Sequence, residues 1–477
     1  MIKIKKFIKL YKNIFKKIFL IIVLCISIIL CYFSYKYITK KKIYIGCLYA
    51  KTGIIGIDSY NNYLILKDSL NYVCKKKNIN LEFIFLYKDL GDNLNNFYNW
   101  MEECIKKYNT KYFFGCWRSN ERKKIIPLLI KYNVRLFYAI QYEGYECVKQ
   151  INYFGSTPNQ QLIPALKYIF SKFEPYKDIY IIGNKYIYPI TTNNIITNFI
   201  KNDKLYAKII KDSYLFEENK YDFKPFIKKI LKESKNGAII INLINGSEIN
   251  NTFIKTFYYM YYKDHPKLSK KIYYNNKLFL DKINDTNIDL KEFYNQYPII
   301  NLSISENSLE KNNLKYMINN YFCTSFTDQI LDDPIYQLSQ GINSAEKDLI
   351  FLKNYKNKNK ILIDDALYGT FLSALFFVNT IDKLINNNLD INDTNIYDKY
   401  RYFSLDSVGG AHEFESNNNI SKNFIILKLN KFNIFNIVYQ NYKSINTQSY
   451  INVFSNNNKD VFCNWENKDR VLYINSI

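Results

Sequence analysis

The chain has 477 residues, and its 66 lysine and arginine side chains against 43 aspartate and glutamate give a formal net charge of +23. This length allows two or three domains, and a content of 48% hydrophobic and 17% aromatic residues excludes a globally disordered chain. Only five basic residues are arginine and eleven lysines lie within residues 1–42, so the remaining surface lacks the clustered cations of a nucleic-acid binder, and we expect no nucleic-acid partner.

The first 42 residues combine a lysine-rich start with an uncharged apolar run. The run IFLIIVLCISIILCYFSY over 18–35 can nearly span a hydrocarbon core of about 30 Å at 1.5 Å per residue. The positive-inside rule orients the lysines toward the cytoplasm. A cleaved signal peptide is the alternative, but bulky aromatic residues stand where its small-residue cleavage site would be. We predict a cytoplasmic segment over 1–17 and a transmembrane anchor over 18–38, in a single-pass membrane protein whose main part is extracellular, periplasmic or lumenal.

Cysteine and histidine patterns do not indicate a metal centre. The chain has nine cysteines and two histidines, His265 and His412, without any C-x-x-C pair. Seven cysteines follow the predicted anchor, so at least one thiol stays unpaired even in an oxidising compartment. We interpret most of them as small buried hydrophobic residues, and we expect no metal and no cofactor.

After Lys42, short apolar runs alternate with segments of helical periodicity. We predict strands at 43–49, 80–87, 111–115, 135–140, 178–183, 205–210 and 237–244. We predict helices at 58–73, 94–108, 123–132, 160–173, 192–201, 223–234 and 249–262. This alternation indicates parallel sheets covered on both faces, with too many units for one sheet of ordinary width, and therefore two α/β lobes. Three lysine- and asparagine-rich stretches interrupt it, and we interpret them as surface insertions or flexible loops: 263–297, 341–360 and 386–397.

Four short motifs carry a family resemblance. They are GCWRS followed by RK (115–123), YEG (142–144), PNQ (158–160) and YIYP (186–189). In this order and spacing they resemble the urea-binding and short-chain amide-binding members of the periplasmic solute-binding proteins, which are of the branched-chain amino-acid-binding type. Weaker agreement extends over most of 43–440.

The resemblance implies the type I periplasmic-binding-protein fold, which has two Rossmann-like lobes with a ligand cleft between them. It implies three crossovers between the lobes, which we expect near 155–159, 300–305 and 400–408. Lobe 1 then comprises 43–157 plus 301–400, and lobe 2 comprises 158–300 plus 401–477. Ligands of such sheets lie beyond the carboxyl ends of the parallel strands.

The resemblance also implies ligand contacts from the serine of the GC turn and from both tyrosines of YIYP. A neutral amide or urea has N–H donors and a carbonyl but no charge, so its site needs hydroxyl and amide partners in an apolar frame. The candidate ligand-binding residues are Trp117, Ser119, Tyr138, Ile140, Gln141, Tyr186, Tyr188 and Ser305. We interpret Glu143 and Arg122 as structural residues that pair or cap near the cleft.

Several positions depart from the family pattern. Arg118 stands where relatives are usually uncharged, and an anionic ligand becomes plausible if its side chain points into the cleft. Lys185 replaces the usual aspartate or threonine before the YIYP turn, and Asn418 and Asn419 stand where relatives often have histidine.

We predict that the protein is not an enzyme but a membrane-anchored solute-binding protein that closes on a small amide or urea-like ligand and delivers it to a membrane permease. G-x-S-x-G, P-loop and G-x-G-x-x-G motifs are absent. An amidase-type site at Cys116 is the weaker alternative, because that cysteine belongs to the GC turn. A second alternative is a receptor ectodomain with a signalling partner, although about 17 residues before the anchor are too few for a cytoplasmic signalling domain. A degenerate lobe pair kept as an interaction module is a third.

Overall fold

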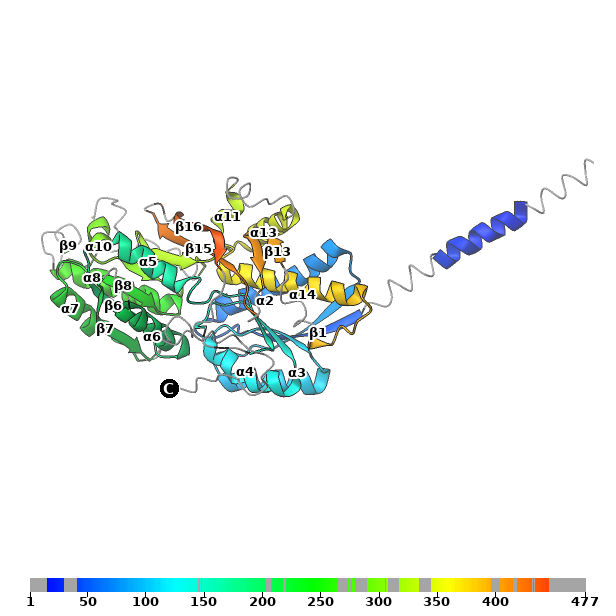
Figure 1. Ribbon diagram of the computed structural model, residues 1–477, viewed down its shortest axis with the longest axis horizontal. Helices are drawn as coiled ribbons and strands as arrows, with labels where there is room; N and C mark the ends of the chain where they lie inside the picture. Colours follow the sequence, from blue (N-terminus) through cyan, green and yellow to red (C-terminus); the bar gives the residue numbers. More distant parts are fainter. Residues whose placement is uncertain are drawn as a thin grey trace, which may run out of the picture.

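The computed structural model describes residues 15–29 and 41–445 apart from short gaps. The gaps are 145, 147, 203–206, 218–219, 265–272, 275–276, 279–289, 305, 308–316, 334–344, 396–403, 415–417, 431 and 433. Two open sheets dominate the described part of the chain, each covered by helices on both faces (Figure 1). The prediction of a two-lobed α/β protein is therefore confirmed.

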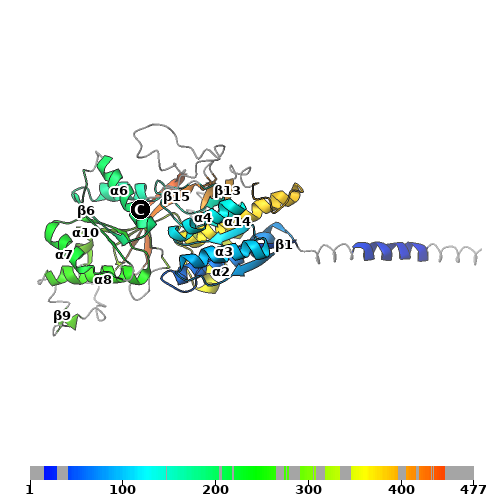
Figure 2. The ribbon, with the colours of Figure 1, turned by 90° about the horizontal axis from the view of Figure 1, so that it is seen from below.

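The first lobe contains a five-stranded parallel sheet with the order β2-β1-β3-β4-β5. Its strands are β1 (Lys41–Leu48), β2 (Leu81–Tyr87), β3 (Tyr112–Gly115), β4 (Arg135–Tyr138) and β5 (Ile151–Tyr153). Helices α2 (Gly56–Lys77) and α14 (Asp365–Asn386) cover one face, and α3 (Leu94–Tyr108) and α4 (Ser119–Tyr132) cover the other (Figures 1 and 2). Side chains of β3 alternate accordingly, since Tyr112 and Phe114 pack with α2 and α14 whereas Phe113 packs with α3 and α4.

The second lobe contains a seven-stranded sheet with the order β16-β15-β12-β11-β8-β6-β7. Its strands are β6 (Asp178–Asn184), β7 (Ile209–Phe216), β8 (Ile239–Leu243), β11 (Ile299–Asn301), β12 (Tyr321–Thr324), β15 (Lys422–Leu429) and β16 (Phe435–Ile445). The strands from β12 to β7 are parallel, and β15 and β16 run antiparallel to their neighbours. Helices α5 (Leu162–Lys172) and α6 (Ile187–Asn202) share one core cluster with this sheet, while α7 (Lys224–Glu233), α8 (Ser247–Asp264) and α10 (Leu290–Gln296) pack on its other face.

The chain crosses between the lobes after β5, after β12 and before β15. The crossover predicted at 300–305 is wrong, because β11 pairs with β12 and keeps the chain in the second sheet as far as Thr324. Asn301 and Tyr321–Thr324, which the prediction assigned to lobe 1, thus belong to the second sheet. The first and third crossovers run side by side, since Tyr153 N donates to Asn418 O (2.8 Å) and Ile420 N donates to Tyr153 O (3.1 Å).

Of the predicted strands and helices, one strand is clearly displaced. The strand predicted at 205–210 is β7, which begins only at Ile209 and continues to Phe216. It is one of the two edge strands of its sheet, and its half-exposed side chains weaken the apolar pattern that marks a strand.

The three lysine- and asparagine-rich stretches are not mere flexible loops where the structure describes them. The first contains the hairpin β9 (Tyr273–Tyr274) and β10 (Lys277–Leu278) and the helix α10. The second forms α13 (Glu346–Asn359), whose Phe351 ring stacks on Tyr72 at 4.2 Å between centroids. In the third, the Arg135 guanidinium donates to Thr394 O at 3.0 Å. The second and third stretches pack on the lobes through such apolar or backbone contacts, while most of their described polar side chains are exposed.

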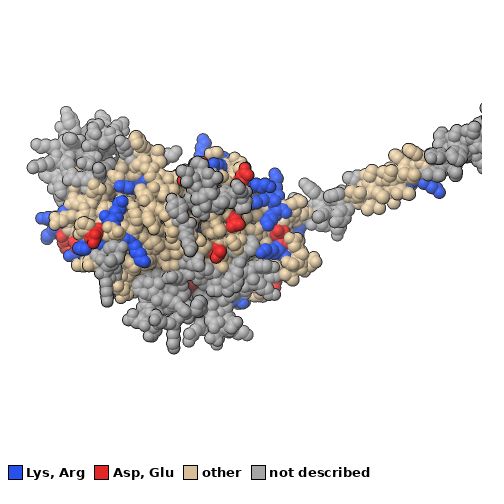
Figure 3. Space-filling model, turned by 45° about the horizontal axis from the view of Figure 1, so that its top comes forward, with Lys and Arg blue, Asp and Glu red and all other residues tan. Residues whose placement is uncertain are grey.

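Residues 15–29 form a helix whose side chains are exposed throughout. Within the described ranges, no helix combines the length and the apolar character needed to cross a membrane. Residues 30–38 of the predicted anchor and 1–14 of the lysine-rich segment lie outside the described residues. Figure 3 shows lysine and arginine side chains in small groups across one face of the lobes, interspersed with acidic ones.

Candidate functional site

A small cavity lies between the two lobes, where the carboxyl ends of the parallel strands of both sheets meet. Its volume is about 60 Å³, and residues from both lobes line it. For comparison, an enclosed apolar cavity of about 150 Å³ binds one benzene molecule. The cavity is therefore small, on the scale of a solute smaller than benzene.

A sharp turn after β3 brings three consecutive residues, Trp117, Arg118 and Ser119, to the cavity wall. Gly115 has a φ of +120°, and a Cβ atom there would lie 2.3 Å from Leu48 O. Only glycine fits such a left-handed position against another backbone. Tyr138 supports the turn from beneath, since its hydroxyl donates to Trp117 O at 3.1 Å.

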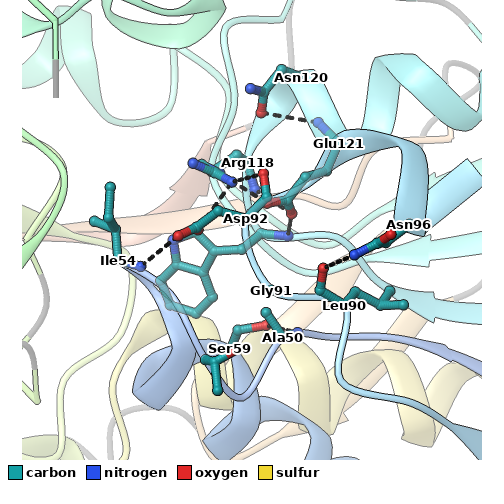
Figure 4. A network of polar contacts seen from close by, with 12 residues as sticks. Ala50, Ile54, Ser59, Leu90, Gly91, Asp92, Asn96, Arg118, Asn120 and Glu121 are labelled. Carbon is teal, nitrogen blue, oxygen red and sulfur yellow. Dashed lines mark hydrogen bonds and ion pairs between the residues drawn. The ribbon is translucent and has the colours of Figure 1, made fainter. Parts of the chain in front are cut away.

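Arg118 lies at the cavity with its charge already compensated. Its Nε donates to Glu121 Oε1 at 2.8 Å, and its Nη2 lies 3.2 Å from Asp92 Oδ1 (Figure 4). Glu121 also accepts the backbone N–H groups of Trp117 (2.8 Å) and Arg118 (3.1 Å), which closes the first turn of α4. Burial raises the pKa of the Glu121 carboxyl, and Arg118 opposes that shift. The guanidinium is thus held by two carboxylates of the first lobe.

Ser119 connects the cavity to a buried ionic cluster. Its hydroxyl donates to Glu143 Oε2 at 2.6 Å. Arg122, which is fully buried, donates to Glu143 Oε1 at 3.0 Å and to both carboxylate oxygens of Glu146 at 2.9 and 3.1 Å. Desolvation raises the pKa of Glu146, but Arg122 and Lys123 outweigh it and hold that pKa below its ordinary value. These contacts agree with the interpretation of Arg122 and Glu143 as structural residues beside the cleft.

The second lobe supplies the opposite wall of the cavity. Tyr188 is the second residue of α6, and burial raises the pKa of its hydroxyl to about 12. Gln141 of the first lobe donates through Nε2 to Tyr188 Oη (3.3 Å) and to Leu302 O. Ser303 Oγ is buried there and forms no hydrogen bond of regular geometry with the described residues. The lobes are therefore in direct contact, and polar groups still face the space between them.

The helix α14 contributes its first residues to the cavity. Asp364 caps the helix by accepting from Leu367 N at 3.0 Å. Asp365, the next residue, lines the cavity and accepts from Lys422 Nζ at 3.1 Å and from the Ser325 hydroxyl. Both charged residues that line the cavity, Arg118 and Asp365, thus have oppositely charged partners.

Six of the eight predicted ligand-binding residues line the cavity. They are Trp117, Ser119, Ile140, Gln141, Tyr186 and Tyr188. Tyr138 is fully buried beneath Trp117 and does not line it. Ser305 lies outside the described residues, although Ser303 lines the cavity.

Sequence reasoning missed four polar residues of the wall. They are Asn245, Ser303, Thr324 and Asp365. The first three follow or end the parallel strands β8, β11 and β12, and the rule that ligands lie beyond carboxyl strand ends could have identified them.

The other departures from the family pattern lie away from the cavity wall. Lys185 is exposed and pairs with Glu217 at 3.2 Å. Asn418 has a left-handed φ of 59°, which asparagine tolerates better than most residues, and Asn419 Oδ1 accepts the Tyr142 hydroxyl at 2.6 Å. Cys116 is buried, and burial raises the pKa of its thiol, whereas a cysteine nucleophile needs a lowered one.

The chain matches the family described as periplasmic binding protein domain over residues 43–456. Its fold is similar to a solute-binding protein of an ABC transporter from Rhodopseudomonas palustris in complex with 4-hydroxybenzoate (TM-score 0.62, 14% identity, 85% of this chain and 97% of that one). It is also similar to the branched-chain amino acid transporter substrate-binding protein LivJ from Streptococcus pneumoniae in complex with isoleucine (TM-score 0.62, 11% identity, 85% and 99%). A third similar structure is the leucine-binding protein LivK from Thermotoga maritima (TM-score 0.61, 11% identity, 84% and 98%).

Proposed function

Because the chain belongs to the periplasmic binding protein domain family, we propose that it captures a small neutral amide or urea-like solute by closure of its two lobes. The family consists of solute-binding proteins rather than enzymes, and the chain is accordingly a non-enzymatic binder of small ligands. The amide class of the ligand, the membrane anchor and the transporter partner are our proposals beyond this family assignment.

Two properties of the cavity support an amide ligand: its small size, and the pairing of the charged side chains in its wall. A space smaller than the cavity of about 150 Å³ that binds benzene suits urea or a short amide, which are smaller than benzene. Isoleucine and 4-hydroxybenzoate are larger than benzene, so they require a larger space. Arg118 and Asp365 are each paired within the protein, so a ligand charge finds no free partner at either residue.

The polar groups of the wall match both ends of an amide. The first N–H groups of α4 have no carbonyl partner within the helix, and the Ser119 and Asn120 amides can donate to a ligand carbonyl. Hydroxyl and amide oxygens of Ser119, Ser303 and Asn245 can accept ligand N–H groups. Trp117 and Tyr186 supply flat apolar surfaces against a planar solute.

We further propose that the lobes are extracytoplasmic, that residues 18–38 anchor them to a membrane, and that the captured solute passes to a transporter in that membrane. The lysine-rich start before an apolar run supports the anchor and its orientation. The descriptions of the similar solved structures as transporter components support delivery.

Thermal unfolding of the detergent-solubilised full chain tests the ligand class. The probes are acetamide, urea at millimolar concentration, isoleucine and 4-hydroxybenzoate. A ligand at one hundred times its Kd stabilises the folded state by about 2.7 kcal/mol, which raises the Tm by several degrees. We expect acetamide or urea to do so, and stabilisation by isoleucine or 4-hydroxybenzoate alone would show the amide assignment to be wrong.

A further inference from the structure

We propose that Glu143 determines specificity by fixing the Ser119 hydroxyl as a hydrogen-bond acceptor toward the cavity. The site then selects solutes that offer an N–H group at this position and rejects carboxylates of the same shape. This inference rests on the proposed function and names the chemistry by which that site chooses its solute.

The hydrogen bond between Ser119 and Glu143 has only one possible direction. Ser119 Oγ lies 2.6 Å from Glu143 Oε2. A carboxylate oxygen can only accept, so the single hydroxyl proton of Ser119 points at Glu143. Ser119 is 2% exposed and Glu143 is 1% exposed, so water does not compete for this proton. Arg122 Nη1 donates a long hydrogen bond to Ser119 Oγ (3.4 Å), so the oxygen has one lone pair, and no proton, left for a ligand.

The ionic cluster keeps Glu143 in this role. Arg122 Nη2 donates to Glu143 Oε1 at 3.0 Å, so the carboxylate uses one oxygen for Arg122 and the other for Ser119. The Arg122 guanidinium cannot swing away, because it also holds Glu146 and lies 4.5 and 4.9 Å from the ring centroids of Tyr138 and Tyr142. Glu143 is therefore a positioning residue that acts through Ser119.

A primary amide and a carboxylate differ at this point. The NH₂ group of acetamide or urea can donate to Ser119 Oγ while its carbonyl faces the N–H groups of α4. Acetate has the same shape but would place an oxygen lone pair against the oxygen of Ser119. A buried acceptor left unpaired in this way lowers affinity by about 10- to 100-fold.

The substitution Glu143→Gln tests the direction of the bond. Arg122 requires an acceptor, so the side-chain oxygen of the introduced glutamine takes the place of Oε1 and its NH₂ group faces Ser119. That NH₂ group donates to Ser119 Oγ, and the hydroxyl proton turns toward the cavity. Glu146→Gln is the matched control, since it removes the same charge from the same arginine without touching Ser119.

Calorimetric titration of the full chain with acetamide and with acetate gives the affinity ratio for each variant. We expect wild type to prefer acetamide about 10- to 100-fold, Glu143→Gln to lower that ratio at least about tenfold, and Glu146→Gln to keep it. Ser119→Ala leaves the ion pairs intact and should bring the ratio toward one, which tests the inference even where Glu143→Gln fails to fold.

Three results would overturn the inference. An unchanged ratio in Ser119→Ala or in folded Glu143→Gln would remove the proposed role while leaving amide binding in place. An equal change in both glutamine variants would assign the effect to charge alone. Wild type that binds neither acetamide nor urea would overturn the proposed function together with this inference.

Discussion

Replacing Arg118 by methionine should destabilise the protein strongly while leaving capture of a neutral solute nearly unchanged. Arg118 is 7% exposed, and its partner Glu121 has a side chain only 1% exposed. Methionine keeps much of the arginine stem volume but leaves the Glu121 carboxylate with two backbone N–H groups as its remaining donors.

The size of the effect follows from which of the two ion pairs is buried. Breaking a buried pair by removing one partner costs about 3–5 kcal/mol, because the other charge stays in the protein without compensation. The pair with Asp92 contributes less than about 1 kcal/mol, since that side chain is 37% exposed. We therefore expect a loss of about 3–5 kcal/mol that comes almost entirely from Glu121.

Unfolding in guanidinium chloride measures this loss, since urea is a candidate ligand. The double variant Arg118→Met with Glu121→Gln removes the stranded charge and should recover most of the stability. The reasoning is refuted when the single variant loses under about 1 kcal/mol, or when the double variant is no more stable than the single one. Loss of acetamide binding by a folded variant would show that Arg118 itself holds the ligand.

Three further outcomes are expected. Burial raises the pKa of Glu306 from an ordinary 4.5 to about 8, so the folded state retains a proton that the unfolded chain loses. Stability should fall by up to roughly 4 kcal/mol from pH 5 to pH 8 and stay flatter in Glu306→Gln, as measured by denaturant unfolding at both pH values. Gly115→Ala forces a Cβ to within 2.3 Å of Leu48 O, and a Tm lowered by several degrees is expected; an unchanged Tm would contradict the need for glycine. Tyr186→Ala should weaken acetamide binding about tenfold or more while changing the free energy of unfolding by less than about 1.5 kcal/mol, and the reverse pattern would make Tyr186 a packing residue.

Most of the fold could be predicted because strands buried on both faces stand out as short apolar runs. The strand β7 was displaced because an edge strand with half-exposed side chains lacks that pattern. The predicted position of the second crossover, at 300–305, was wrong for a different reason. Whether the chain leaves the sheet after β11 or after β12 depends on pairing between strands, and no local pattern records it.

The sequence could predict which residues line the cavity where they belong to a recognisable motif, but not elsewhere. The turns at 115–119 and 186–189 brought Trp117, Ser119 and Tyr188 to the cavity as expected. Ser303 and Thr324 are single small polar residues just after β11 and at the end of β12, and these two strands were not among those predicted, so the strand-end rule was not applied to them. Tyr138 lies beneath the turn and not at the cavity wall; a tyrosine beneath a turn and one facing a ligand have the same local sequence.

The hydrogen bonds of Gln141 affect how well a transporter can distinguish solute-bound protein from solute-free protein. It belongs to the first lobe yet hydrogen-bonds Tyr188 and Leu302 of the second, so the protein itself supplies hydrogen bonds that hold the two lobes together. A solute can shift the balance between open and shut forms only by its preference for the shut one. Hydrogen bonds between the lobes favour the closed form whether or not a solute is bound, so they make the change in population on binding smaller and the affinity higher. A transporter that recognises only the closed shape would then also bind protein without solute, and Gln141 would influence how often that happens.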